Sequence, residues 1–276
     1  MDHLRRDLAP VSDAAWEAID AEATRTLRHF IAGRALVEFT GPHGWEHPAA
    51  NLGRVEPADP APEGVEAARR RVQPVVELRT PFELSRAELD AVDRGAADPD
   101  LAALDEAARR AALAEDRAVF HGYAPGGITG MTEASPHQPL TISDDYNEYP
   151  AIVARAVSAL SAAGIGGPYA IALGPRCYTG VIETTEHGGY PVFEHIRLVL
   201  GGPIVRAWAV DGAVVVSQRG GDFDFVCGQD LSIGYRSHTA DTVGLYLEES
   251  FTFQVREPRA AVALVYPNAG GRRRRE

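Results

Sequence analysis

Residues 219–235 read RGGDFDFVCGQDLSIGY and combine three aspartates, four glycines, three aromatic residues and one cysteine. This composition supports two hypotheses. The stretch is either an active site in which Cys227 is the nucleophile and a nearby aspartate assists it, or a structural unit of strands and turns. Cys227 lies between Val226 and Gly228 in an otherwise apolar run. An apolar strand tends to bury a cysteine as a small hydrophobic residue and to raise its pKa, so the local pattern favours a packing role.

The composition of the 276-residue chain is that of a soluble globular protein, with 45% hydrophobic and 24% charged residues. A net charge of −12 argues against nucleic acid as the main partner, because phosphate binding requires a positive surface. Two cysteines are too few for a disulfide framework, and we expect a cytoplasmic protein. The sequence shows no signal-peptide pattern and no apolar run of membrane-spanning length, so no membrane association is expected.

All 27 cationic residues counted as Lys or Arg are arginines. The absence of lysine excludes Schiff-base chemistry, a lysine general base and a P-loop lysine. No GxSxG or GxGxxG motif occurs in a supporting context. HGWEH (43–47) carries two histidines, but the glycines and prolines around it disfavour the helix that a metal-binding pair would need. We therefore predict no catalytic and no metal-binding residues.

Local patterns predict helices inserted among strands without a regular βαβ rhythm, which is typical of the α+β class. Residues 12–34 place apolar side chains at helical spacing, with Ser12 as the N-cap. Two further helices are expected at 98–121 and 148–163. Strands are expected to dominate residues 169–183, 202–223 and 243–267, and a mobile polar loop is expected at 186–195.

A long two-stranded arm is predicted before the helix at 98–121. Residues 58–89 combine a Pro-rich tip with the alternating run VVELRTPFEL (75–84), and alternation flanked by turn residues favours paired strands. Such an arm is marginally stable alone and normally needs a partner surface.

Several segments resemble the encapsulins, the bacterial nanocompartment shell proteins also known as linocin-type proteins. RGGDF and GQDLSIGY within residues 219–235 match a segment of that family. The resemblance covers nearly the whole chain to about Pro267 and leaves the tail NAGGRRRRE outside it. Further matching segments, in the family's order and spacing, include LAPVSDAAWEAID (8–20), GPHGWEH (41–47), VELRTPFEL (76–84) and FTFQV (251–255).

The resemblance implies an α+β, HK97 phage-capsid-like fold with a peripheral domain, an axial domain and an extended arm, the E-loop. The implied parts are an N-terminal helix with the start of the peripheral domain (1–47), the E-loop arm (48–80), the peripheral domain with its spine helix (81–129), the axial domain (130–219), the return to the peripheral domain (220–267) and a basic C-terminal tail (268–276) that we expect to be disordered.

Family members form icosahedral shells, so the resemblance implies that this chain assembles with copies of itself. At this length we expect the smallest arrangement, T=1, with larger shells as the alternative. The arm would then add its strands to a neighbouring copy and satisfy its free edges. The phage relative reinforces its shell with Lys–Asn links, which a chain without lysine cannot form.

The role implied by the resemblance is to enclose a cargo enzyme, such as a dye-decolourising peroxidase or a ferritin-like iron-storage protein. A short C-terminal targeting peptide of the cargo would dock between the N-terminal helix and the peripheral domain. An apolar floor with carboxylates and one arginine suits a peptide with Leu or Ile anchors and a terminal cation. The alternative is that these residues only pack the helix onto the domain. By resemblance, the residues are Phe30, Ile31, Arg34 and Glu38 on one wall and Asp230, Leu231 and Ile233 on the other.

The resemblance also implies a pore at the five-fold axis, lined by the loop Glu186, His187, Gly188, Gly189 and Tyr190. Its glycines would make the loop mobile, and the histidine would make its charge pH-dependent. Some relatives bind flavin against an aromatic residue near the ELD segment. Ala87 occupies that position here, so we expect no flavin or other cofactor.

Two other hypotheses stay open beside a shell protein without enzymatic activity. One is a protease or bacteriocin-like enzyme that uses cysteine or serine, and the other is a prophage major capsid protein. The sequence names neither the cargo nor the shell size, and it leaves the role of the RRRRE tail open.

Overall fold

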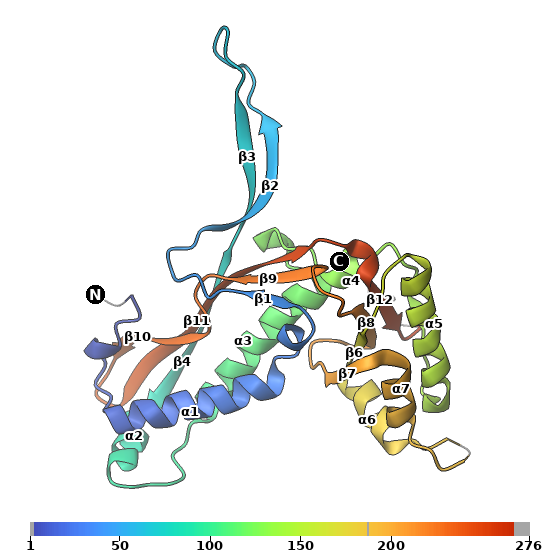
Figure 1. The fold of residues 1–276 in the computed structure, drawn as a ribbon. Coiled ribbons are helices and arrows are strands. Elements are labelled where there is room, and N and C mark those ends of the chain that lie inside the picture. Colours follow the sequence, from blue (N-terminus) through green and yellow to red (C-terminus); the bar gives the residue numbers. More distant parts are fainter. Residues whose placement is uncertain (1–2, 187, 268–276) are drawn as a thin grey trace, which may run out of the picture.

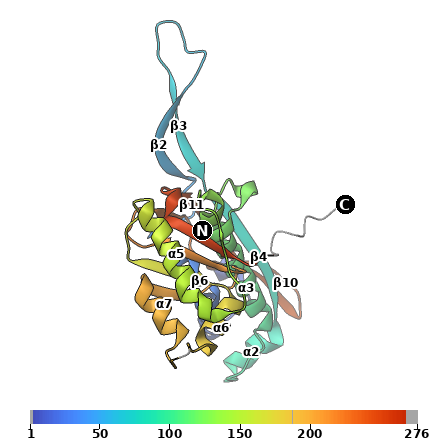
Figure 2. The same ribbon diagram turned by 90° about the vertical axis from the view of Figure 1, so that its right-hand side faces the viewer.

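The structure, a computed structural model, describes residues 3–186 and 188–267. Figure 1 shows three parts: a first lobe that contains the long helices α1 and α3, a second lobe that contains α5, α6 and α7, and an arm. The arm is formed by β2 and β3. Figure 2, turned by 90°, shows that it projects clear of both lobes.

The sheet of the first lobe is organised around one 14-residue strand, β11. All ten residues of β4 pair antiparallel with residues 242–251 of β11. β10 and β9 share the other edge, with β10 along the first half and β9 along the second. β1 extends the sheet parallel to β9. The strands are β1 (Glu38–Thr40), β4 (Val76–Ser85), β9 (Phe223–Cys227), β10 (Ser232–His238) and β11 (Thr242–Val255).

The α-helices described in this lobe are α1 (Asp13–Phe30), α2 (Arg86–Asp93) and α3 (Ala102–His121). The predicted N-cap is confirmed, because the Ser12 hydroxyl accepts a hydrogen bond from the backbone N–H of Ala15 at 3.1 Å. The apolar stripe of α1 is buried against α3 and the sheet, and Ile19 on this stripe has no exposed surface. Burying such a side chain stabilises the fold by about 1.5–3 kcal/mol.

The helix α1 ends at Phe30, four residues earlier than the sequence predicts. The buried Asp116 carboxylate on α3 accepts hydrogen bonds from the backbone N–H groups of Ala32 and Gly33, at 3.0 and 2.8 Å. These donors turn toward α3 and do not continue the helix, and a short 3-10 helix follows. The 3-10 helices are Arg6–Leu8, Gly33–Ala35, Ala124–Gly126, Tyr146–Glu148 and Pro258–Ala260.

The arm is a single antiparallel hairpin of β2 (Ala49–Pro57) and β3 (Ala68–Pro74). The predicted two-stranded arm is present, but it is shorter than 48–80 because the alternating run VVELRTPFEL does not belong to it. That run forms β4, which pairs with β11 in the first lobe and buries Phe82 and Leu84 there. Alternation alone does not identify the partner strand, because any half-buried strand produces it.

The second lobe contains a five-stranded sheet in the order β5-β12-β8-β6-β7. β12 pairs with β5 and β8, so the chain re-enters this lobe after the first. The sequence instead predicts that all of 220–267 stays with the peripheral part. The strands are β5 (Leu140–Thr141), β6 (Tyr169–Leu173), β7 (Gly201–Arg206), β8 (Ala213–Ser217) and β12 (Ala261–Val265).

The helices of the second lobe are α4 (Met131–Ala134), α5 (Tyr149–Ala162), α6 (Pro175–Glu183) and α7 (Val192–Leu200). α5 confirms the helix predicted at 148–163. The sequence predicts mainly strand in residues 169–183, but the structure has the helix α6 from Pro175 to Glu183. It predicts a loop at 186–195, but α7 begins at Val192. β-branched residues favour a strand in α6 and the Gly-Gly turn favours a loop before α7, but the buried side chains of both segments recur at helical spacing, and α7 packs on α5.

Helices and mainly antiparallel strands in irregular order make this the predicted α+β class. Within residues 3–186 and 188–267, no helix combines the length and the apolar character needed to cross a membrane.

Candidate functional site

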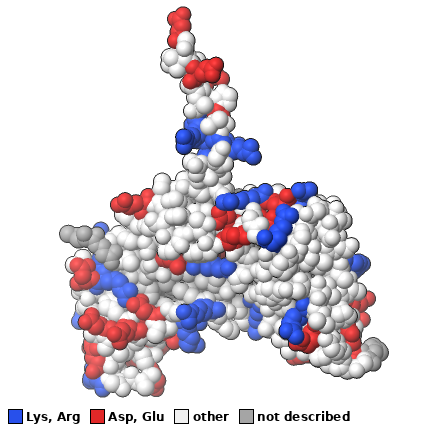
Figure 3. All heavy atoms as spheres, in the orientation of Figure 1, with Lys and Arg blue, Asp and Glu red and all other residues white. Residues whose placement is uncertain are grey.

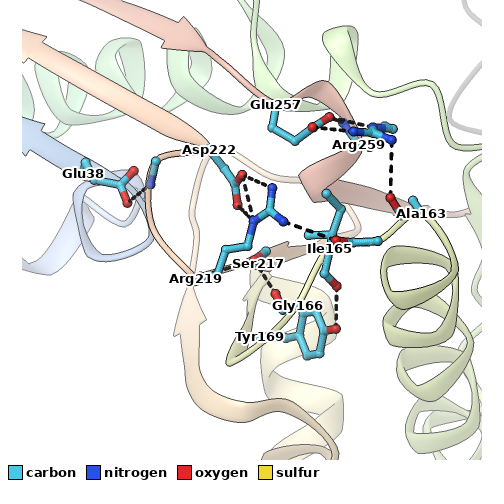
Figure 4. Close-up of polar contacts among 12 residues, drawn as sticks. Glu38, Ala163, Ile165, Gly166, Tyr169, Ser217, Arg219, Asp222, Glu257 and Arg259 are labelled. Atoms are coloured by element: carbon cyan, nitrogen blue, oxygen red, sulfur yellow. Dashed lines mark hydrogen bonds and ion pairs between the residues drawn. The ribbon is translucent and has the colours of Figure 1, made fainter.

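The RGGDF segment is a turn that joins the two lobes (Figure 4). The Arg219 guanidinium donates hydrogen bonds to both carboxylate oxygens of the buried Asp222, at 2.8–3.1 Å, and one to the carbonyl of Gly164 at 3.3 Å. Gly220 and Gly221 have φ values of +92° and +81°, which other residues rarely adopt. The Gly221 N–H donates to Glu38 at 2.8 Å. The segment is therefore framework.

Cys227, at the end of β9, is fully buried. Burial raises the pKa of its thiol to about 12, and the negative charges of Asp230 and Glu249 add to this effect. The thiolate is the nucleophilic form of cysteine, so this thiol is inert near neutral pH. The predicted packing role of Cys227 is confirmed. Cys177 is also buried, beside the hydroxyl of Tyr149 at 3.2 Å.

The two histidines of HGWEH lie close together, with the ring centroids of His43 and His47 4.5 Å apart. Burial and the neighbouring His43 lower the pKa of His47. Among the described residues, no group of three or more His, Cys, Asp or Glu side chains has the geometry to hold a metal ion.

Arg34, just beyond the end of α1, is the centre of a buried ionic cluster. Its guanidinium contacts the carboxylates of Glu115 at 2.7 Å, Asp230 at 2.8 Å and Glu249 at 2.6 Å. Glu115 on α3 and Glu249 on β11 are buried, whereas the Asp230 side chain is 42% exposed. The cluster therefore joins α3, β11 and the loop before β10 to the chain that leaves α1.

The ionic cluster carries more acidic than basic groups. Burial raises the pKa of Glu249 well above its ordinary value, and the charge of Glu115 raises it further, while Arg34 opposes the shift. Burial alone would lower the pKa of Arg34, but its hydrogen bond to Glu115 and the three carboxylates raise it. The cluster therefore places three carboxyl groups around one guanidinium, an excess of acidic groups.

A groove of about 490 Å³ lies above this cluster, between α1 and the loop before β10. Four of the predicted cargo-binding residues line it: Ile31 and Arg34 from the N-terminal side, and Asp230 and Leu231 from the other. The groove therefore combines apolar side chains with the exposed part of a cluster in which acidic groups outnumber the guanidinium.

The other three predicted cargo-binding residues lie elsewhere. The Phe30 ring packs against Trp208, with centroids 5.2 Å apart. Glu38 accepts the Gly221 N–H at the RGGDF turn and lines a separate hollow. Ile233 is 4% exposed in the core of the first lobe. Adjacency in sequence does not determine which of these side chains face the groove.

Sequence reasoning missed four further lining residues, Thr24, Leu27, Arg28 and Ala35. Thr24, Leu27 and Arg28 share a face of α1 by helical spacing, and Ile31 follows directly after the last residue of the helix. The helical spacing of positions 24, 27 and 28 could have predicted that these side chains line the groove. The position of Ala35 depends on the turn after the helix and has no such signal in the sequence.

The described residues of the predicted pore loop lie between α6 and α7. The Glu186 N–H donates to the carbonyl of Tyr190 at 2.8 Å, and the Glu186 carboxylate contacts His195 at 2.7 Å. Gly188, Gly189 and Tyr190 are exposed. His187 lies outside the described residues, as does the tail 268–276.

A protein-family model described as "Encapsulating protein for peroxidase" matches residues 1–252. The chain belongs to the encapsulin family of shell proteins. The type 1 encapsulin shell protein of Rhodospirillum rubrum is 48% identical over 270 residues, which cover 96% of each chain. The family assignment confirms that the chain is a shell protein and not an enzyme, so the hypothesis of an active site at Cys227 is wrong.

Solved structures show the fold of this encapsulin. The virus-like particle from Pyrococcus furiosus has a TM-score of 0.66 at 16% identity, covering 91% of this chain and 99% of its own. The capsid of an empty GTA particle has a TM-score of 0.52 at 15% identity, covering 85% of this chain and 90% of its own. The HK97 phage-capsid-like fold is confirmed. A capsid likeness at this identity shows the fold alone, so it does not favour the prophage hypothesis.

Proposed function

We propose that this encapsulin assembles in the cytoplasm into a closed T=1 icosahedral shell, which encloses a cargo enzyme through a C-terminal targeting peptide. The observation that supports cargo binding is the groove beside α1, which Ile31 and Leu231 line together with Arg34 and Asp230 of the ionic cluster. The family description names peroxidase as the enclosed protein, which supports an enzyme of that kind as the cargo.

Self-assembly is supported by apolar side chains that the isolated chain leaves in water. Leu198 on α7, Ile182 on α6 and Tyr190 in the pore loop are 68%, 51% and 45% exposed. All three lie in the second lobe, the proposed axial domain, which would meet its copies around a symmetry axis. The loop 186–190 would then ring the five-fold pore. Repeating such heterologous contacts until the rotation closes produces a shell.

The T=1 arrangement predicts a hollow particle of sixty copies, about 1.8 MDa for a 29.6 kDa chain. Mass photometry or light scattering of the purified chain, with electron microscopy of the same sample, measures this directly. A uniform particle of about three times that mass would reject T=1 and retain the shell. A monomer or small oligomer under gentle conditions would reject self-assembly.

The groove suits a peptide with Leu or Ile anchors and a cation. The apolar side chains of Leu27, Ile31 and Leu231 would cover the anchors, and the partly exposed carboxylate of Asp230 would receive the cation. Arg34 contacts Oδ1 of this carboxylate and is itself held by Glu115 and Glu249, so Oδ2 of Asp230 would receive the cation of the peptide.

Changing Ile31 to aspartate is expected to lower cargo loading by at least about tenfold, because it places a charge where an apolar anchor would be buried. The probe is a fluorescent protein fused to a short C-terminal peptide with leucine and isoleucine anchors and a terminal arginine. It is co-expressed with the shell, and fluorescence per shell mass is measured in the particle fraction.

The matched control is Ala21→Asp, which adds the same charge to α1 outside the groove. It is expected to load cargo as the unchanged chain does. Intact Ile31→Asp particles that retain full loading would show that the peptide binds elsewhere.

A further inference from the structure

A hollow of about 300 Å³ lies on the first lobe, beside the N-terminal segment 3–6 and the strands β4, β10 and β11. Its volume is at the lower end of the range of small-molecule pockets. It shares no lining residue with the groove beside α1. Arginines and ring-bearing side chains dominate its lining, namely His3, Arg5, Trp45, Arg79, Arg236 and Tyr246.

Two of the three arginines in the hollow lack an acidic partner. Acidic and basic side chains are mixed over the face of the two lobes that Figure 3 displays. Arg79 follows this pattern, because its guanidinium contacts Glu248 at 2.6 Å and Glu77 at 3.0 Å. Within residues 3–186 and 188–267, the side chains of Arg5 and Arg236 form no ion pair and no hydrogen bond. The hollow therefore holds two uncompensated positive charges, although the whole chain has a net charge of −12.

The backbone departs from regular geometry at both unpaired arginines. Arg5 has a φ of +54°, and it is the only residue other than glycine with a positive φ in the described part of the chain. An L-residue adopts this conformation at a cost in free energy. Arg236 is the extra residue of a β-bulge, where β10 shifts its register against β11. Bulges redirect side chains and recur next to active sites. Two independent irregularities thus bring two guanidiniums to one hollow.

Aromatic rings give the hollow flat, apolar surfaces. The His3 ring stacks on Trp45, with centroids 4.7 Å apart and 11° between the planes, and contacts the buried Glu248 carboxylate at 3.2 Å. The Tyr246 ring lies across Gly234 of β10, where a Cβ would come within 2.3 Å of the Tyr246 Cζ. Trp45 is 49% exposed, so its ring offers apolar surface that an organic group can cover.

We propose that this hollow binds a phosphomonoester, a small organic molecule that carries one terminal phosphate. Arg5 and Arg236 hold the phosphate, and the exposed ring of Trp45 covers the organic group. This binding site is additional to shell formation and cargo enclosure and does not depend on either of them.

The charge and the geometry of the two arginines favour phosphate over other anions. A phosphomonoester carries a charge near −2 at pH 7.5, because its second pKa is about 6. Two unpaired guanidiniums match this dianion, whereas a carboxylate requires only one. The planar fork of a guanidinium also donates two parallel hydrogen bonds to phosphate oxygens. The hollow is large enough to hold an organic group beside the phosphate.

The competing occupant is an acidic segment of a neighbouring copy, which the same two arginines would attract. In that arrangement the assembled protein has no free hollow, and loss of either arginine weakens assembly. Binding of a small molecule to the assembled protein therefore separates the two occupants.

The test uses the full chain in the assembled state in which it is purified. Isothermal titration calorimetry at pH 7.5 measures the binding of AMP, ribose 5-phosphate, inorganic phosphate and adenosine. The substitutions are Arg236→Ala, Arg236→Lys and Arg5→Gly. Glycine adopts a positive φ without strain, so Arg5→Gly removes the guanidinium and retains the turn. The matched control is Arg155→Ala, an exposed arginine of α5 in the second lobe.

We expect AMP to bind the unchanged chain with a dissociation constant below about 1 mM. Arg236→Ala and Arg5→Gly should each weaken this binding at least tenfold, because each removes one of the two guanidiniums. Arg236→Lys should lie between the unchanged chain and Arg236→Ala, since lysine keeps the charge and loses the fork. The control should bind as the unchanged chain does, and adenosine should bind at least tenfold more weakly than AMP.

Trp45→Ala tests the organic group separately. It should weaken AMP binding at least fivefold and leave the binding of inorganic phosphate unchanged. Equal affinities for AMP and inorganic phosphate, with no effect of Trp45→Ala, would overturn the role of the ring and identify free phosphate as the ligand. Ribose 5-phosphate that binds as tightly as AMP would identify a sugar phosphate.

Two kinds of result would overturn the site itself. If AMP, ribose 5-phosphate and inorganic phosphate all fail to bind, and Arg236→Ala lowers the assembled fraction in analytical ultracentrifugation, the hollow is a contact between copies. If the three ligands fail and assembly is unchanged, the hollow binds neither. Equal AMP affinity of the unchanged chain, Arg5→Gly and Arg236→Ala would place the phosphate elsewhere. Thermal midpoints of all variants, measured by circular dichroism without ligand, show that a lost affinity is not a loss of folding.

Discussion

Replacing Arg34 with alanine is expected to lower the free energy of unfolding by about 3–5 kcal/mol. The change removes the cation that contacts the buried carboxylates of Glu115 and Glu249, at 2.7 and 2.6 Å, and leaves them unpaired. The measurement is the midpoint of thermal unfolding followed by circular dichroism, where a loss of this size corresponds to a decrease of roughly 10 °C.

The pH dependence of this loss provides an internal check. Burial raises the pKa of the Glu249 carboxyl, and its protonation at lower pH removes unpaired negative charge, so the Arg34→Ala variant should lose less stability at pH 5 than at pH 8. Arg34→Lys keeps the charge but has fewer donors, and its midpoint should fall between those of the unchanged chain and the alanine variant.

The matched control is Arg28→Ala, which removes an exposed arginine from the same groove. It should change the midpoint by no more than about 2 °C, because an exposed substitution alters stability by about 0.5 kcal/mol or less. An Arg34→Ala midpoint equal to that of the control would show that the ionic cluster does not hold the lobe together.

Stability is expected to decrease as the pH rises from 5 to 8, and Asp116 is the main cause. Its side chain is fully buried, and burial raises its pKa to about 7 although the N–H groups of Gly33 and Ala32 favour the charged form. The pKa of an aspartate in an unfolded chain is about 4. Between these values the folded chain holds a proton that the unfolded chain has lost, so the free energy of unfolding falls as the pH rises.

The expected loss totals up to about 4 kcal/mol, is complete near pH 7 and does not grow above it. Below about pH 4 both states are protonated and the full contribution is present. Asp116→Asn keeps an oxygen acceptor for the backbone donors and is uncharged at every pH. Its unfolding midpoint should therefore change much less between pH 5 and pH 8 than that of the unchanged chain.

Thermal midpoints at pH 5, 6, 7 and 8 for both chains test this expectation. Asp13→Asn, at an exposed position in the first turn of α1, is the matched control and should follow the unchanged chain. Parallel profiles for the Asp116→Asn variant and the unchanged chain would show that the proton resides on another group. Glu249, whose pKa is also raised by burial, accounts for the slope that remains in the variant.

The ionic cluster illustrates what sequence spacing cannot predict. Arg34 lies 81 residues from Glu115, 196 from Asp230 and 215 from Glu249. The family resemblance implied that Arg34 and Asp230 share a site, but no pattern indicated the two glutamates beneath them. They come from α3 and β11, and only the packing of these elements brings them within 3 Å of one guanidinium.

The sequence by itself determined the features that depend on near neighbours. Ser12 and the apolar spacing after it specify α1, and the Ala-rich run specifies α3, because capping and side-chain spacing act within a few residues. The absence of lysine and the motif RGGDF…GQDLSIGY, which led to the family, are likewise properties of the linear chain.

The tertiary structure alone decided the features that depend on distant contacts. It moved β4 from the arm to the first lobe, because β11 offers an edge along which ten residues of β4 pair. It ended α1 at Phe30, because the buried Asp116 takes the next backbone donors. It also made α7 a helix where the polar residues after the Gly-Gly turn predict a loop, because its buried face packs on α5. In each case the energy of long-range burial and hydrogen bonding exceeds the weak local preference of the segment.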